Sequence, residues 1–182
     1  MKRMKVITIA ISVILASSLI PSAEAASKGY RYWGYYQAQS KFGDTSPKSV
    51  SWKASMTGPT SKIPDGSVEG WVFTFDNSDI PSTPPSVKPS FGKICGTTKA
   101  EEGMKRVAIV IDFGSPLIAP KGEKVARTIT RCVVTGKDSL GIDILAQVVK
   151  VRTASSGFVC GLNGYPAKEC GVEIATPKGL KK

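Results

Sequence analysis

The chain has 182 residues, enough for one ordinary domain or two small ones. It carries 25 Lys and Arg residues against 14 Asp and Glu residues, and it has no histidine. The missing histidine excludes the Ser-His-Asp and Cys-His arrangements of common hydrolases and removes the most frequent transition-metal ligand. The net charge of +11 suggests attraction to anionic polymers or lipid head groups, although it also serves solubility.

Residues 1–25 predict a secretory signal peptide. The segment starts with MKRMK, continues with an apolar run over Val6–Leu15, and has small residues at Ala23 and Ala25. Because roughly 20 apolar residues are needed to span a bilayer, we expect no transmembrane segment in the mature chain. The prediction is a secreted, extracellular protein that can associate with the cell envelope, a setting in which nucleic acid is not a partner.

Residues 26–77 are rich in aromatic side chains and in strand signals. Alternating patterns predict an antiparallel meander of three strands, over Gly29–Gln39, Ser49–Met56 and Val68–Phe75. The segment holds all three indoles of the chain, Trp33, Trp52 and Trp71. These rings are either a stacking platform for a flat ligand or the core of a small sheet.

Residues 78–92 are rich in Pro and Ser and predict a linker in which a strand is disfavoured. Residues 93–176 predict a second unit. Its expected strands are Lys105–Gly114, Ala126–Val134, Phe158–Leu162 and Gly171–Ala175. A helix with Asp138 as its N-cap separates the second strand from the third.

The order strand, strand, helix, strand, strand is that of a β-grasp-like unit. The predicted fold class is therefore α+β and mostly β, with the meander, the linker and this unit following one another. The basic tail over 177–182 is expected to be loose.

The four cysteines predict two disulfides, because an exported chain meets an oxidising compartment. Three pairings are possible, and we prefer Cys160–Cys170 as a local clamp and Cys95–Cys132 as a longer link. Asn163-Gly164 and Pro166 lie inside the clamp and favour a tight turn. The sequence therefore predicts a disulfide-locked hairpin between the last two strands.

Carboxylates can act in hydrolysis without histidine, and three are candidates: Asp65, Glu69 and Asp112. A structural role explains the aspartates better, since Asp65 lies in a Pro-Asp-Gly turn, where Asp is common, and Asp112 lies at a strand end, where it can cap backbone amides. Calcium favours oxygen ligands such as those of Asp76, Asn77 and Asp79, but the spacing lacks the EF-hand pattern. We expect no catalytic residue, no metal and no cofactor.

Three passages occur together in the chain. They are YRYWGYY through DGSVEGW at Tyr30–Trp71, KRVAIVIDFG at Lys105–Gly114 and CGLNGYPAKECG at Cys160–Gly171. The set resembles a family of uncharacterised secreted proteins of actinobacteria. Members of that family are often encoded near energy-coupling-factor importer components and near proteins like transcobalamin.

The second unit alone resembles the small β-grasp-type domain that accompanies transcobalamin-like proteins. In such folds, loops at the sheet edge cover a flat corrin ring, and the resemblance places Asn163, Gly164 and Tyr165 there. We expect a non-enzymatic module that presents a corrinoid-like small molecule to importer components. Its expected contacts are those three residues together with Trp33, Trp52 and Trp71. The alternative is a structural or interaction protein that binds cell-envelope polymers.

Overall fold

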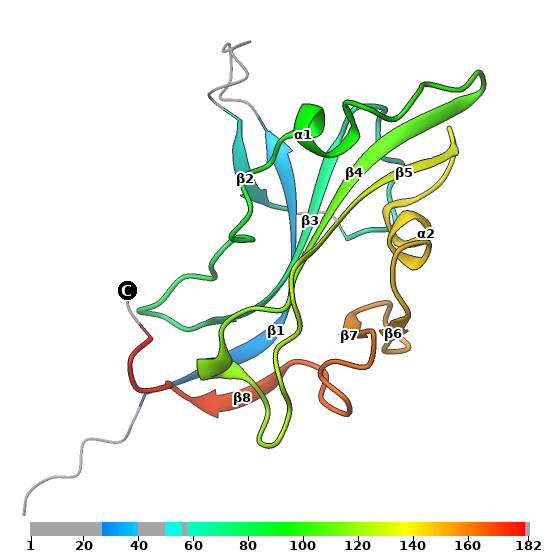
Figure 1. Ribbon diagram of the computed structural model, residues 1–182. Coiled ribbons are helices and arrows are strands. Elements are labelled where there is room, and N and C mark those ends of the chain that lie inside the picture. The colour runs from blue at the N-terminus through cyan, green and yellow to red at the C-terminus, as the bar shows by residue number, and fades with distance from the viewer. Residues whose placement is uncertain (1–26, 40–49, 56–57, 181–182) are drawn as a thin grey trace, which may run out of the picture.

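The computed structural model of the protein describes residues 27–39, 50–55 and 58–180. The predicted signal peptide, residues 1–25, lies outside the described residues. A six-stranded mixed sheet dominates the described part, with two short α-helices and a two-stranded ribbon packed beside it (Figure 1). The predicted class, α+β and mostly β, is confirmed.

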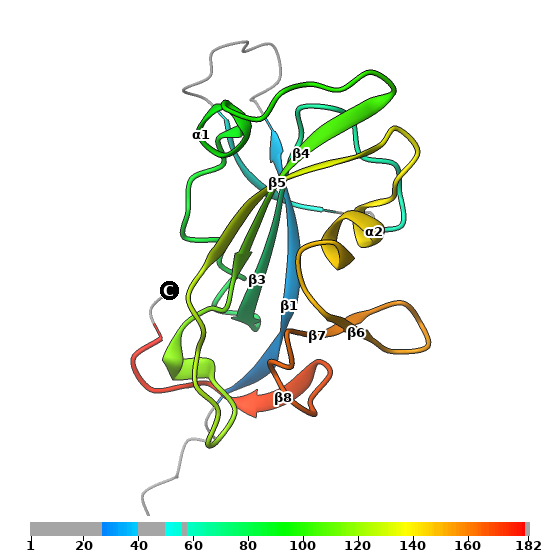
Figure 2. The ribbon, with the colours of Figure 1, turned by 45° about the vertical axis from the view of Figure 1, so that its right-hand side comes forward.

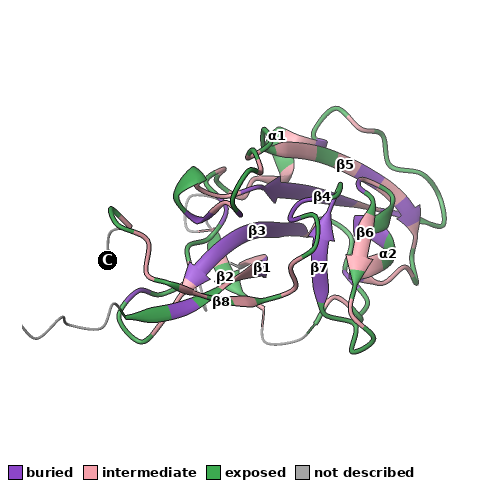
Figure 3. Ribbon diagram, turned by 90° about the horizontal axis from the view of Figure 1, so that it is seen from below, coloured by how far each residue is buried: buried purple, intermediate pink, exposed green. Residues whose placement is uncertain are grey.

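The sheet has the strand order β2-β1-β3-β4-β5, and β8 also pairs with β1. The bounds of its strands are β1 Lys28–Gln39, β2 Ser51–Ala54, β3 Val68–Asp76, β4 Met104–Asp112, β5 Ile129–Gly136 and β8 Val172–Ala175. Only β3 and β4 pair in parallel, and the other pairs are antiparallel. Both central strands are buried along most of their length (Figure 3), as the nearly continuous apolar sequence of β4 predicts.

The sheet continues across the stretch that the sequence marks as a linker. β3 precedes residues 78–92 and β4 follows them, yet Val68–Val72 pair with Ala108–Asp112. Residues 78–90 contain neither helix nor strand, as their prolines predict, and the helix α1 (Phe91–Cys95) follows them. This stretch packs on the sheet, since the Tyr36 hydroxyl donates to Ser82 Oγ at 2.8 Å.

The other face of the sheet is covered by the helix α2 (Gly141–Ala146) and by the ribbon of β6 (Val151–Thr153) and β7 (Val159–Leu162) (Figure 2). The larger hydrophobic cluster lies between these layers. The predicted N-cap Asp138 is wrong, because Leu140 occupies that position and its N–H donates to the Asp143 side chain. Asp138 instead forms an exposed ion pair with Lys62.

Both predicted disulfides are confirmed, but the predicted hairpin between β7 and β8 is wrong. β7 pairs with β6, whereas β8 pairs with β1. The carbonyls of Cys160 in β7 and of Pro166 and Glu169 in the loop accept hydrogen bonds from the Arg152 guanidinium, so these groups are not available for a ladder between β7 and β8. The Cys160–Cys170 bond therefore closes a loop rather than a hairpin.

Candidate functional site

Among the described residues, strand β1 has a gap in the pairing of its outer edge. β3 occupies the inner edge, while the outer edge is shared by β8, which pairs with Lys28–Arg31, and β2, which pairs with Tyr36–Gln39. One further bond runs from the Ser55 N–H to the Tyr35 carbonyl, at 2.9 Å. Within the described chain, no strand pairs with Tyr32–Gly34 on this edge. Figure 1 shows β2 beside one end of β1 and β8 beside the other.

A groove of about 520 Å³ lies along this gap, and we name it the β1 edge groove. Its lining residues are Tyr32–Tyr35, Ser55, Gly58–Thr60, Trp71 and Ser156–Val159. A second hollow shares Tyr32 and Phe158 with it and continues toward Cys170. The two hollows together extend beside β1 as far as the second disulfide.

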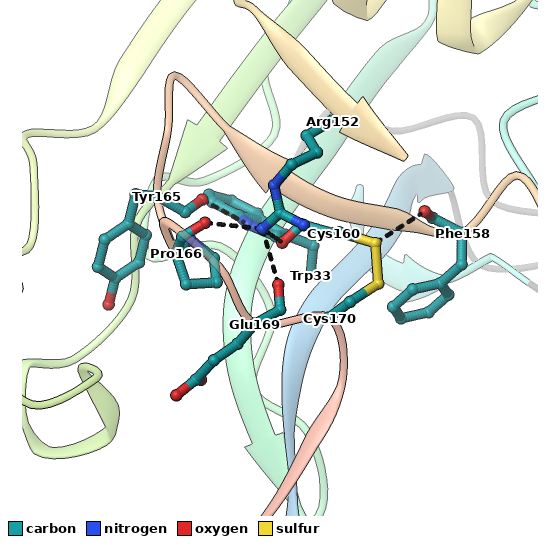
Figure 4. The surroundings of a disulfide bond; sticks show 8 residues. All are labelled: Trp33, Arg152, Phe158, Cys160, Tyr165, Pro166, Glu169 and Cys170. Atoms are coloured by element: carbon teal, nitrogen blue, oxygen red, sulfur yellow. Dashed lines mark hydrogen bonds between the residues drawn. A yellow bond between two sulfur atoms is a disulfide. The ribbon is translucent and has the colours of Figure 1, made fainter. Parts of the chain in front are cut away.

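Aromatic rings form much of the wall of the β1 edge groove. Tyr35 and Trp71 stack with their ring centroids 4.6 Å apart. Phe158 is 42% exposed and lies beside the Cys160–Cys170 disulfide (Figure 4). An exposed aromatic ring on a fixed support is a favourable contact for an apolar or flat ligand.

A buried carboxylate fixes the phenol of Tyr35. Glu69 is 2% exposed and accepts a hydrogen bond from the Tyr35 hydroxyl. Burial raises the pKa of Glu69, against the opposing effects of that hydrogen bond and of Lys105. Burial and the neighbouring carboxylate also raise the pKa of Tyr35 far above its ordinary value. The phenol therefore stays protonated and keeps its orientation in the groove wall.

Two arginines hold the loop that the second disulfide closes. Arg152 Nη2 donates to the carbonyls of Cys160, Pro166 and Glu169 at 3.2, 2.8 and 2.7 Å (Figure 4). On the outside of the loop, Arg31 forms a bidentate ion pair with the Glu169 carboxylate. Such a loop loses little conformational entropy when a ligand binds next to it.

The predicted contact residues do not lie together in one site. Trp33 and Trp71 line the β1 edge groove, although they are only 3% and 2% exposed and belong to the core. Trp52 packs against the smaller hydrophobic cluster, where its Nε1 donates to the Val87 carbonyl at 2.8 Å. The indoles thus serve mainly as core, which was one of the two interpretations of the sequence.

The loop residues Asn163, Gly164 and Tyr165 line a different hollow, beside Glu123 and Lys124. Asn163 and Gly164 have positive φ values of 51° and 81°, as the Asn-Gly pair predicts. Tyr165 points inward, and its carbonyl accepts a hydrogen bond from Trp33 Nε1 at 3.0 Å.

Sequence reasoning did not single out Phe158 or Tyr35 as site residues. In the sequence Phe158 looks like the first apolar residue of a strand, and only the preceding Ser155-Ser156-Gly157 turn hints that it is exposed. The gap in the edge of β1 has no local signal, since it depends on where two distant strands end.

The candidate acids are engaged by donors of the chain itself. Asp65 Oδ1 accepts the Arg106 N–H at 2.6 Å, and the Asp112 carboxylate accepts the N–H groups of Ser86 and Gly114. Asp112 therefore caps backbone amides, as the sequence suggested, whereas Asp65 bonds to a strand residue distant in the sequence rather than within its own turn. In the described ranges, no three His, Cys, Asp or Glu side chains gather closely enough to hold a metal ion.

These observations define a mostly β protein with a mixed sheet, two disulfides and an aromatic groove at a sheet edge. Residues 25–175 match the family model of the SCO2322-like domain, so the chain belongs to that family. The family is uncharacterised and named after a Streptomyces protein, in agreement with the actinobacterial resemblance. The family match does not support the resemblance of the second unit to the domain of transcobalamin-like proteins, and that resemblance stays a prediction. No curated protein and no solved structure matches the chain.

The two disulfides point to an oxidising, extracellular environment. Neither helix in the part of the chain that the structure describes has the length and apolar character needed to cross a bilayer.

Proposed function

We propose that this protein is a secreted, non-enzymatic binding module that holds a small molecule in the β1 edge groove and presents it to importer components. The observation that carries the proposal is a groove of about 520 Å³ with aromatic walls, at a stretch of β1 with which no described strand pairs on the outer edge. This volume falls within the range of ligand pockets, roughly 300–1,000 Å³.

The hydrogen bonds that the candidate carboxylates accept favour a binding function over a catalytic one. Asp65 and Asp112 each accept hydrogen bonds from backbone amides, and Glu69 is tied to Tyr35. A general acid or base must instead face the substrate within hydrogen-bonding reach. These side chains therefore support the fold rather than a reaction.

A corrinoid is the first ligand to test, because the sequence resemblance implies one. The edge of its flat ring would lie against Phe158 and Tyr35, since conjugated rings favour stacked or edge contacts with aromatic side chains. With no histidine in the chain to ligate cobalt, recognition would depend on the ring and its substituents.

Calorimetric titration of the oxidised protein with cobinamide and cobalamin tests this proposal. We expect micromolar binding that weakens by about tenfold in Phe158→Ala, because the exposed ring is lost. Leu117→Ala is the matched control, since Leu117 is 51% exposed but lies outside the groove. Equal affinity of both variants would contradict the assignment of the groove. No binding, together with no small molecule co-purifying by mass spectrometry, would contradict the function.

The net charge of +11 favours a second candidate, an interaction protein that adheres to anionic polymers of the cell envelope. Retention on anionic vesicles or purified wall at low salt, with loss at high salt, would support it. Retention that does not depend on salt would contradict it.

A further inference from the structure

The hollow that continues toward the second disulfide has an aromatic lining and one carboxylate. Its volume is about 430 Å³, and we name it the aromatic hollow. Its lining residues are Tyr30, Tyr32, Asp76, Phe158, Cys170 and Gly171. Tyr30 is 53% exposed and Phe158 is 42% exposed, so two large rings are accessible to a ligand. Exposed rings that gather around one hollow are typical of a binding site.

Segments far apart in the sequence build the aromatic hollow. Tyr30 and Tyr32 are alternate residues of β1, so their side chains share one face of the sheet. Asp76 lies opposite Tyr30 in the antiparallel pairing of β1 with β3, which places its side chain on that same face. Phe158 comes from the segment before β7, where its carbonyl accepts the Ala154 N–H at 2.9 Å. The pairing of the strands and this backbone bond therefore fix the positions of the rings.

Asp76 is a carboxylate without a cationic partner in the described chain. Its Oδ2 accepts a hydrogen bond from the Tyr32 hydroxyl at 2.6 Å, and burial together with this carboxylate raises the pKa of Tyr32. No ion pair among the described residues includes Asp76. Lys28, on the same face of β1, pairs with Glu173 at 3.0 Å instead. The negative charge of Asp76 is therefore left unneutralised beside the rings, in a chain whose net charge is +11.

Rings and a carboxylate together favour a cationic ligand. An aromatic face attracts a cation through the quadrupole of the ring, and a carboxylate adds a full negative charge. A primary ammonium group brings three N–H donors that each need an acceptor, whereas a quaternary ammonium group brings none. The lining is mostly aromatic, and Asp76 Oδ2 already accepts the Tyr32 hydroxyl. The quaternary group therefore suits this hollow better.

We propose that the aromatic hollow binds a quaternary ammonium group, with its methyl groups against Tyr30, Tyr32 and Phe158 and its charge balanced by Asp76. The inference goes beyond the proposed function, because Tyr30 and Asp76 line this hollow and not the β1 edge groove. The group occurs in free solutes such as choline and in the headgroup of phosphatidylcholine.

Titration of the ¹⁵N-labelled, oxidised protein with choline, followed by amide shifts, tests the inference. The neutral probe is neopentyl carbinol, in which carbon replaces the nitrogen of choline. Sodium chloride is exchanged for choline chloride at each step, so that the ionic strength stays constant. We expect choline to bind with millimolar affinity and to shift the amides of Tyr30 and Gly171. Neopentyl carbinol should bind at least about tenfold more weakly, because it has the shape without the charge.

Two pairs of variants separate the charge from the ring. Asp76→Asn removes the charge but keeps an acceptor for Tyr32, and it should weaken choline binding at least about fivefold. Asp79→Asn is the matched control, since Asp79 is exposed and lies outside the hollow. Tyr30→Leu should also weaken binding, whereas Tyr30→Phe should not, because only the second keeps a ring. Tyr30 is exposed, so this second pair tests the site without disturbing the core.

Equal affinity for choline and neopentyl carbinol would overturn the inference, as would equal affinity of Tyr30→Leu and Tyr30→Phe. Absence of shifts at the highest soluble choline concentration, or tighter binding of ethanolamine than of choline, would overturn it as well. These failures leave the proposed function intact, because the cobinamide titration tests the β1 edge groove separately.

Sedimentation with phosphatidylcholine vesicles distinguishes the two sources of the group. Co-sedimentation that choline competes away supports the inference and assigns the hollow to the lipid headgroup. Choline binding without co-sedimentation supports the inference and assigns the hollow to a free solute.

Discussion

Glu69 shows how a single buried residue shapes the groove. Its carboxyl lies inside the sheet at β3 and holds the Tyr35 hydroxyl, whose ring stacks on Trp71 in the groove wall. The sequence marked Glu69 only as one of three candidate carboxylates for hydrolysis. The structure explains it as a support for an aromatic wall, a role that depends on the pairing of β1 with β3 and is invisible in either strand alone.

The raised pKa of Glu69 predicts a pH dependence of stability. Its ordinary pKa is 4.5, and burial raises it in the folded state. The stabilisation from the protonated carboxyl is complete below the unfolded value and is lost as the pH rises through the folded value. Glu69→Gln should therefore gain in relative stability between pH 4 and pH 7, measured by urea unfolding. The same difference in stability at both pH values for Glu69→Gln would contradict the account.

At the scale of elements, alternation and apolar runs predicted most strands to within a few residues. The pairing of β8 with β1 was not predicted, because the disulfide suggested a local hairpin and no local signal shows that β1 has a free edge near Lys28–Arg31. The exposed position of Phe158 was not predicted either, because it too depends on pairing between strands distant in the sequence. Sequence periodicity shows the face of a strand, but it does not show which distant strand completes its edge.

The two disulfides should contribute unequally to stability. Cys95–Cys132 closes a loop with a sequence separation of 37, and Cys160–Cys170 one of 10. The loop-entropy model gives about 4 kcal/mol for the longer loop and about 3 kcal/mol for the shorter one. Urea unfolding of the two double Cys→Ser variants measures the difference. A larger loss for the shorter loop would show that native contacts around Arg152 and Phe158 outweigh loop entropy.

At the scale of the whole molecule, one sheet joins the segments on both sides of the Pro- and Ser-rich stretch. β3 and β4 pair in parallel across it, and β8 returns to β1 near the C-terminal end of the described chain (Figure 1). Neither segment by itself contains the complete sheet. Sequence composition marked a boundary at residues 78–92, but composition does not report the pairing of strands that lie on either side of it.

This continuity predicts a single cooperative unfolding transition. Because the central strands belong to different segments, residues 26–77 and 93–176 should lose structure together. Scanning calorimetry should give a calorimetric enthalpy equal to the van't Hoff enthalpy. Two separate transitions would contradict the continuous sheet.

The most direct test of the account is the rate of amide hydrogen exchange along β1 in the free, oxidised protein. The N–H groups of Arg31 and Gln37 face the strands β8 and β2, whereas that of Trp33 faces the gap. We predict that the Trp33 amide exchanges at least about tenfold faster than the other two, because no strand among the described residues pairs with it. Equal protection of all three amides would show that the edge is already closed, and would contradict the β1 edge groove as a binding site.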